Sequence, residues 1–315
     1  MAQPTNTFSS FDAVGNREDL SDIIYAVSPA ETPFLSKIPR VKATGTPHEW
    51  KIDSLAAASS TNFVIEGDDA TTDAITATSR VYNYRAISDK VARVTGTQEA
   101  VSKAGRRSEM AYQMERRMKE LKRDVEKIHL ENNASVAGND TLASESAGLQ
   151  AWVLTNTSKA SDATASAGNG TDAHTDGTAR ALTEAMVETV LASAWTEGGN
   201  PTMGLLNAFQ KRKFAAFSGS STKFSDGDGK KVVNTVDIYI DPLGNEVKLV
   251  PCRQAPADVV YFVDPEYVAH AVLRDFGTTE LAKTGDSVRK QILTEYTLEV
   301  RNQKAHAAIY DLTTS

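Results

Sequence analysis

The chain of 315 residues contains a single cysteine, Cys252, and this scarcity limits its chemistry. One thiol cannot form a disulfide within the chain or a cysteine-rich zinc site. The cysteine content therefore gives no sign of an oxidising compartment, and we expect Cys252 to be a buried, unreactive thiol.

Long apolar runs and a surplus of positive charge are also missing. No window approaches the roughly 20 apolar residues of a membrane-spanning helix, so we expect no membrane partner. The first twenty residues have neither a cationic start nor an apolar stretch, which argues against a secretory signal. Acidic residues outnumber basic ones by 41 to 34. Because a protein that coats nucleic acid needs Lys and Arg in excess on one face, this balance argues against tight DNA binding.

Catalytic motifs are absent at the level of sequence. There is no glycine-rich phosphate loop, no two-histidine zinc helix and no nucleophile elbow. The segment DGDGKK at 226–231 resembles half of a calcium loop but lacks the closing glutamate. We therefore predict no enzyme activity, no cofactor and no metal, with an enzyme whose site forms only in the fold as an alternative. The histidines are isolated along the chain, and none is assigned a role: His48, His129, His174, His270 and His306.

An apolar, proline-stiffened segment stands near the start of the chain, after an amphipathic helix predicted at 17–27. It reads SPAETPFLSKI, residues 28–38. Pro29 and Pro33 lack a backbone donor and push the residue before them toward extended geometry. This segment cannot form a core of its own, so Phe34, Leu35 and Ile38 need an apolar surface elsewhere.

Two stretches alternate with the period of a β-strand and predict a long ribbon. In TPHEWKIDSL, Trp50 and Ile52 share one side with His48; in RVYNYRAISDK, Tyr82 and Tyr84 share a side. The residues between them are small and acidic, with Phe63 and Ile65 as apolar exceptions and turn chemistry around Asp68 and Asp69. An isolated two-stranded ribbon is marginal in water, so it must lie on its own domain or on a neighbouring copy.

The clearest helix follows Ser108, a good N-cap, and runs through EMAYQMERRMKELKRDVEKIHLENN. Its apolar residues repeat every three or four positions and form one continuous stripe from Met110 to Ile128. The opposite face is charged. Arg116 and Arg117 on that face either belong to a solvated surface with intrahelical pairs or contact a neighbour's acidic loop.

The second half of the chain predicts a mixed α+β domain at about 181–275. Helices are expected after Thr183 and after Asn207, with strands near 203–206, in VVNTVDIYID, in NEVKLVP and in ADVVYFVD. Residues 155–180 are small and polar, which predicts a surface insertion. The terminal segment from Ser287 alternates twice, like a hairpin, and is a candidate sheet for the long helix to cover.

This order of parts resembles the major capsid protein of tailed bacteriophages, which has the α+β Hong Kong 97 fold. The resemblance extends over nearly the whole chain and is carried by FSSFDAVGNREDLSDIIYAVSPAETPFLS, HEWKIDSLAAA, VSKAG, RALTEAM and LAKTGDSVRKQILTEYTLEVRN. It implies an N-terminal arm at 1–40, an extended loop at 41–102, a peripheral domain at 103–180 with 276–315, and an axial domain at 181–275.

The resemblance also implies a function. Copies of the chain are expected to form the hexamers and pentamers of an icosahedral or elongated head shell, with a separate scaffolding protein and a portal. The shell would assemble in the host cytoplasm and enclose double-stranded DNA without reading its sequence. An encapsulin-like compartment and a tail-tube subunit are the alternatives. The expected contacts between subunits are Pro29, Pro33, Phe34, Leu35, Ile38, Trp50, Ile52, Phe63, Ile65, Asp68, Asp69, Tyr82, Tyr84, Arg116 and Arg117.

Overall fold

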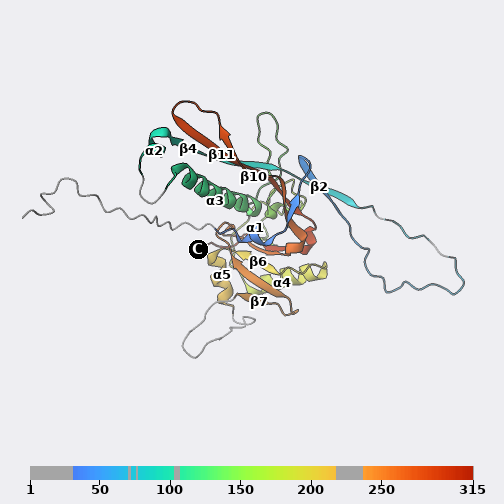
Figure 1. Ribbon diagram of the computed structural model, residues 1–315. Coiled ribbons are helices and arrows are strands. Elements are labelled where there is room, and N and C mark those ends of the chain that lie inside the picture. The colour runs from blue at the N-terminus through green and yellow to red at the C-terminus, as the bar shows by residue number, and fades with distance from the viewer. Residues whose placement is uncertain (1–30, 70–71, 76, 103–106, 218–236, 315) are drawn as a thin grey trace, which may run out of the picture.

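The described part of the chain contains a long helix, several shorter helices, two β-sheets and a projecting two-stranded ribbon (Figure 1). The computed structural model describes residues 31–69, 72–75, 77–102, 107–217 and 237–314. The expectations for Pro29, for the helix at 17–27 and for the turn at 226–231 lie outside these residues. The mixed α+β class predicted from the sequence is confirmed.

The long helix is α3 (Glu109–Leu130), and it begins where the sequence predicts. The Ser108 hydroxyl accepts a hydrogen bond from the Ala111 N–H at 3.2 Å, which satisfies one of the free donors of the first turn. Val125 packs with residues of the neighbouring strands. The whole predicted stripe is buried or half-buried: Met110, Met114, Met118, Leu121, Val125 and Ile128.

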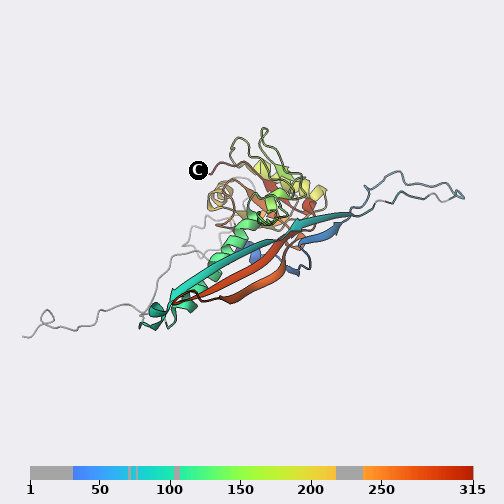
Figure 2. The same cartoon turned by 90° about the horizontal axis from the view of Figure 1, so that it is seen from above.

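A four-stranded sheet lies along α3, as Figure 2 shows, in the order β1 (Arg40–Lys42), β10 (Val268–Leu281), β11 (Ser287–Val300) and β4 (Ala86–Thr95). β1 runs parallel to β10, and the other pairs are antiparallel. The side of β4 that carries Ala92 and Val94 faces the helix, where both pack against Met110. The short helix α2 (Gly96–Ala100) continues directly from β4.

The hairpin predicted within the C-terminal segment is wrong. Residues 287–300 form one strand, β11, which pairs with the preceding strand β10 across a turn where Gly285 has a φ of +84°. After β11, Asn302 caps a short 3₁₀ turn (Gln303–Ala305) that redirects the chain. The alternation therefore continues in a different sheet, where β12 (Ala307–Ile309) is found.

The second sheet has six strands and separates two cores. Its order is β5 (Thr157–Ser158), β12, β9 (Val260–Val263), β6 (Met203–Leu206), β8 (Glu246–Pro251) and β7 (Ile238–Ile240). Because side chains alternate along a strand, Tyr261 and Val263 enter one core while Val260 and Phe262 enter the other. The second core is completed by α4 (Glu184–Thr196) and α5 (Ala208–Ala215), and Asn207 caps α5 as predicted.

Residues 155–180 are not the loose surface insertion that their composition predicts. Asn156, Ser166 and His174 within this segment are buried. The Asn156 side-chain amide donates to the carbonyl oxygens of Lys304 at 2.7 Å and His306 at 2.9 Å. Small residues let the segment approach the body closely, and its polar side chains replace the water that the backbone would otherwise bind.

Candidate assembly surfaces

The ribbon predicted from strand periodicity is present and projects from the body (Figure 2). β2 (Pro47–Ile52) pairs with β3 (Ser79–Tyr84) in antiparallel register, from Pro47 opposite Tyr84 to Ile52 opposite Ser79. Along β2, even-numbered residues are half-buried and odd-numbered residues are exposed. At its base, the ribbon therefore packs against the body through only one of its two faces.

That face packs on the chain's own body. The Trp50 ring lies 5.3 Å from the Trp152 ring, centroid to centroid, and Trp50 borders the main core. His48 Nε2 lies 2.7 Å from Glu299 Oε2. Burial opposes the charge of Glu299, but hydrogen bonds from His48 and Arg301 outweigh it and lower the pKa of this carboxyl. Trp50, expected at a subunit contact, is thus covered to a large extent within its own chain.

Asn83 on β3 is a structural residue that the sequence analysis missed. Its side chain is fully buried. The amide nitrogen donates to the Leu298 carbonyl at 2.7 Å, and the amide oxygen accepts from the Ala147 N–H at 3.0 Å. This residue joins the ribbon to β11 and to the 146–147 segment. The sequence signal is an asparagine in the middle of a strand pattern, which does not reveal partners so distant along the chain.

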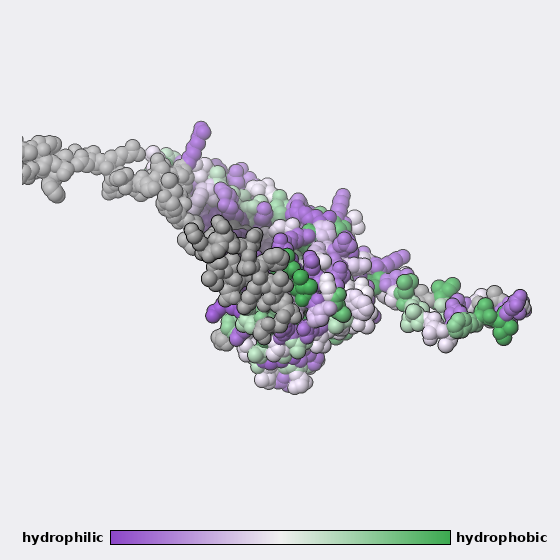
Figure 3. All heavy atoms as spheres, turned by 90° about the horizontal axis from the view of Figure 1, so that it is seen from below, coloured by the Kyte–Doolittle hydropathy of each residue, from purple (hydrophilic) through white to green (hydrophobic). Residues whose placement is uncertain are grey.

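The loop beyond the ribbon, residues 53–78, exposes apolar side chains to a degree that is unusual for a single chain. Figure 3 shows hydrophobic residues gathered along this projection. Phe63 is 87% exposed and Ile65 is 77% exposed, so neither is covered by the body. Asp68 and Asp69 are exposed beside them, at a turn where Gly67 has a φ of +84°. The large exposed hydrophobic residues of this loop are Leu55, Phe63, Val64, Ile65 and Ile75.

The segment from Pro33 is placed differently from the sequence expectation. It forms a short helix, α1 (Pro33–Lys37), and Phe34 and Ile38 are buried in the main core of their own chain. The prediction that these two residues pack on an adjacent subunit is corrected by this burial. Pro33 and Leu35 are half-buried.

Glu126 of α3 holds α1 in place. Its carboxylate accepts hydrogen bonds from the backbone N–H groups of Phe34 at 3.4 Å and Leu35 at 3.2 Å. Negative charge at the N-terminus of a helix is favourable, because the first N–H groups have no partner within the helix. Burial nevertheless raises the pKa of Glu126. Cys252 is its third neighbour, with Sγ 3.2 Å from the carboxylate, and burial raises the pKa of this thiol to about 12.

The remaining predicted contact residues lie on exposed or half-buried surfaces. Tyr82 is 38% exposed, and its ring meets the Tyr84 ring edge-on at 5.4 Å; Ile52 is half-buried. Arg116 and Arg117 both pair with Glu120 on the same helix, at 3.1 and 2.6 Å. This intrahelical pairing agrees with the solvated-face alternative.

Two further properties concern the described part of the chain. None of its helices is long and apolar enough to cross a bilayer. Within the same ranges, one group of side chains has the composition and spacing to hold a cation, namely His174, Asp176 and Asp311. This group lies where residues 155–180 meet the end of β12, on the body rather than on the ribbon.

The long helix, the two sheets and the projecting ribbon with its loop are arranged as in the Hong Kong 97 fold. Solved structures share this fold. The capsid of Cyanophage A-1(L) has a TM-score of 0.65 at 12% identity, covering 99% of this chain and 100% of that one. An encapsulin of Synechococcus elongatus PCC 7942 has a TM-score of 0.54 at 10% identity, covering 93% and 94%. The fold alone therefore does not separate phage heads from encapsulins.

Family membership makes that separation. The chain belongs to the SU10 major capsid protein family, whose model matches residues 3–313. It is also 28% identical to the major capsid protein of Escherichia phage Phieco32 over 346 aligned positions, which cover 98% of both chains. Its function is that of a phage major capsid protein, which forms the capsid shell of the virion.

Proposed function

We propose that this chain builds the head shell as hexamers and pentamers, and that residues 53–78 of each copy bind a neighbouring copy. The observation that carries this proposal is the exposure of Phe63, Val64 and Ile65, at 87%, 87% and 77%. Burying one such side chain contributes roughly 1.5–3 kcal/mol. The contact is repeated by symmetry around every ring, so modest contacts add up to a closed shell.

A receiving surface for this loop must offer exposed apolar side chains. The outward face of β4 offers two, because Ile87 is 49% exposed and Val91 is 43% exposed there; the charged Asp89 and Arg93 share this face. Their strand neighbours on the other side, Ala86 and Ala92, are buried. We assign this outward face as the counterpart of the loop on a second copy.

Membership of the capsid protein family supports the other parts of the proposal. The arm, extended loop, peripheral domain and axial domain are assigned to 1–40, 41–102, 103–180 with 276–315, and 181–275. A separate scaffolding protein and a portal take part in assembly in the host cytoplasm. The chain acts as a structural protein without catalysis. Its net charge of −7 suits a wall that encloses double-stranded DNA without binding it tightly.

The test is a triple substitution, Phe63→Ser, Val64→Ser and Ile65→Ser. We expect shell formation to be lost while the free energy of unfolding of the subunit changes by less than about 0.5 kcal/mol, because these side chains touch little of their own chain. Negative-stain microscopy and sedimentation measure assembly, and urea unfolding measures stability.

The matched control changes three polar residues of the same loop, Ser59→Ala, Ser60→Ala and Thr61→Ala. This control should assemble like the wild type. Normal closed shells from the triple serine variant would show that the loop contact is not required.

A further inference from the structure

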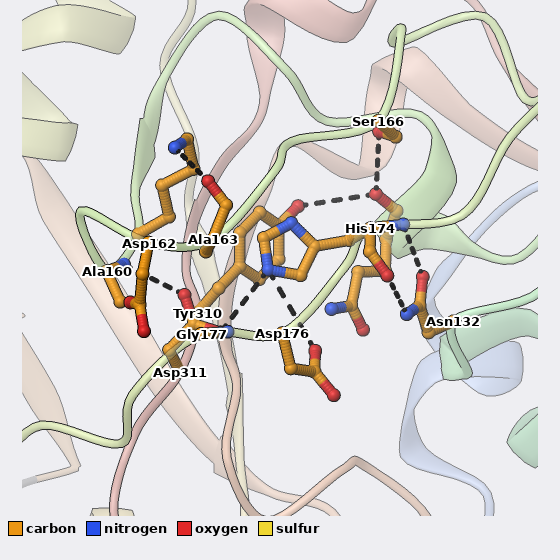
Figure 4. A network of polar contacts seen from close by, with 12 residues as sticks. Asn132, Ala160, Asp162, Ala163, Ser166, His174, Asp176, Gly177, Tyr310 and Asp311 are labelled. Atoms are coloured by element: carbon orange, nitrogen blue, oxygen red, sulfur yellow. Dashed lines mark hydrogen bonds and ion pairs between the residues drawn. The ribbon is translucent and has the colours of Figure 1, made fainter.

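The buried imidazole of His174 lies where residues 155–180 contact the end of β12. Figure 4 shows His174 between Tyr310 and two carboxylates. The His174 side chain is 0% exposed, and its ring lies 4.6 Å from the Tyr310 ring. Within the described residues, its Nδ1 atom has no hydrogen-bond partner. Nε2 points toward Asp311 and Asp176.

The distances around Nε2 are longer than those of a strong hydrogen bond. Nε2 lies 3.4 Å from Asp311 Oδ1 and 3.9 Å from Asp176 Oδ1, and all three ligand atoms lie within 4.8 Å of one another. A good N–H···O hydrogen bond closes to about 2.9 Å. Two ligands that are 2.0–2.1 Å from a tetrahedral Zn²⁺, by contrast, are roughly 3.3 Å apart. The separation of 3.4 Å therefore fits two ligands of one ion, and the exposed Asp176 side chain would move closer to His174 when an ion binds.

The Asp311 carboxylate is held in position by the backbone. Oδ2 accepts the Ala160 N–H and Oδ1 accepts the Gly177 N–H, each at 2.8 Å. Both donors belong to residues 155–180, whereas Asp311 follows β12. Hydrogen bonds of this kind orient a carboxylate ligand and reduce the entropy lost when an ion binds.

The surroundings carry an excess of negative charge. The pKa of Asp258 is raised, first by burial and then by repulsion from carboxylates that include Asp176 and Asp311. Arg180 supplies a positive charge near Asp311, but its Nη2 donates to the Tyr310 carbonyl at 3.3 Å. One guanidinium does not neutralise all of these carboxylates. A divalent cation bound at His174 would balance the remaining negative charge.

We propose that His174 Nε2 and one carboxylate oxygen each from Asp176 and Asp311 bind a divalent transition-metal cation, with Zn²⁺ as the best match. One imidazole and two carboxylates are ligands that Zn²⁺ accepts, and a water molecule completes the tetrahedron. Mg²⁺ is less suitable because it prefers six oxygen ligands. The ion would fasten residues 155–180 to the end of β12, which goes beyond the shell-forming role.

The experiment is calorimetric titration of the chelator-treated, full-length chain with ZnCl₂, with MgCl₂ and CaCl₂ in parallel. We expect one zinc ion per chain, a rise in melting temperature with zinc, and weaker or no binding of the other two ions. Asp176→Asn is the main variant, because that side chain is 63% exposed and its loss leaves no buried group unpaired. It should lower zinc affinity by at least about tenfold.

His174→Gln should abolish binding, and Asp140→Asn, an exposed change elsewhere, should leave it unchanged. If His174→Gln does not fold, Asp176→Asn with its control still decides the question. The proposal is overturned if the wild type takes up no zinc at micromolar free concentration, or if Asp176→Asn binds zinc as tightly as the wild type.

Discussion

At the scale of single residues, buried histidines join elements that are far apart in the sequence. His129 on α3 and His270 on β10 are both buried, with Nε2 of the first 2.8 Å from Nδ1 of the second. One ring must donate and the other accept, so the pair is stable only when at least one ring is neutral. Burial lowers the pKa of His270 to about 4, and it lowers that of His129 well below the usual range.

These shifts predict a loss of stability in mild acid. His306 is also buried, and its pKa is lowered to about 4. Below the ordinary histidine pKa of about 6.5 the unfolded chain binds protons that the folded chain does not, so stability falls as pH decreases toward the folded-state pKa. Each such histidine contributes a slope of at most about 1.4 kcal/mol per pH unit. Urea unfolding of the dissociated chain between pH 7.5 and 5 measures the total slope.

His306→Asn isolates one of these contributions. The asparagine oxygen can replace His306 Nδ1, which accepts the Asp264 N–H at 3.2 Å, but it does not titrate. The pH slope of this variant should be shallower than that of the wild type by about one histidine's share. Identical slopes in the two proteins would contradict the prediction.

Residues whose partners are local could be predicted, and residues whose partners are distant could not. Ser108 and Asn207 are helix caps as expected, because a cap depends on the next few residues. Asn83 bonds to Leu298, 215 positions away, and His174 approaches Asp311, 137 positions away. No sequence pattern marks such pairs, so the histidines looked isolated.

At the scale of elements, periodicity predicted those whose environment is regular along their length. α3 and β2 have one buried and one exposed face, and β6 is buried on both. Periodicity could not show which strand pairs with which, so β11 and β12 were assigned to one hairpin although they belong to different sheets. It also could not show that the apolar side chains of α1 are buried in the core of their own chain.

The placement of α1 predicts that Phe34 stabilises the subunit itself. Phe34 is 0% exposed, and its ring meets His129 edge-on at 6.4 Å. Phe34→Ala should cost about 3–5 kcal/mol of unfolding free energy, because it leaves a cavity in the main core. The same substitution at the 87% exposed Phe63 should cost little. Urea unfolding of both dissociated variants makes the comparison, and equal losses would show that α1 is not part of the core.

The burial of Phe34 and Ile38 in the core decides how much of the arm can be deleted. Removing residues 1–38 would take Phe34 and Ile38 out of the core, so this deletion should destabilise the subunit itself. Removing residues 1–30 leaves every described core residue in place. Only the shorter deletion can separate the role of the arm in assembly from the role of α1 in folding.

At the scale of the whole molecule, the body buries its apolar core side chains within one chain, whereas the loop leaves Phe63, Val64 and Ile65 exposed. The two cores on either side of the six-stranded sheet are fully buried within one chain. The described residues of 53–78 project away from the body, as Figure 3 shows. The order of elements and the sequence resemblance predicted a shell subunit, and the family match confirms it. The residue-level contacts between copies stay a prediction.

The contrast between the buried cores and the exposed loop predicts that assembly raises the melting temperature of the subunit. Anything that binds the folded chain but not the unfolded chain raises its melting temperature, and a neighbouring subunit acts in this way. Wild-type shells should therefore melt at least about 5 °C above the Phe63, Val64 and Ile65 triple serine variant at the same chain concentration. Dissociated wild-type subunits should melt with the variant, because the substituted side chains contribute little within their own chain. Scanning calorimetry of the three samples measures these differences. Shells that melt at the temperature of the free subunits would mean that contacts between copies stabilise nothing beyond the fold of each chain.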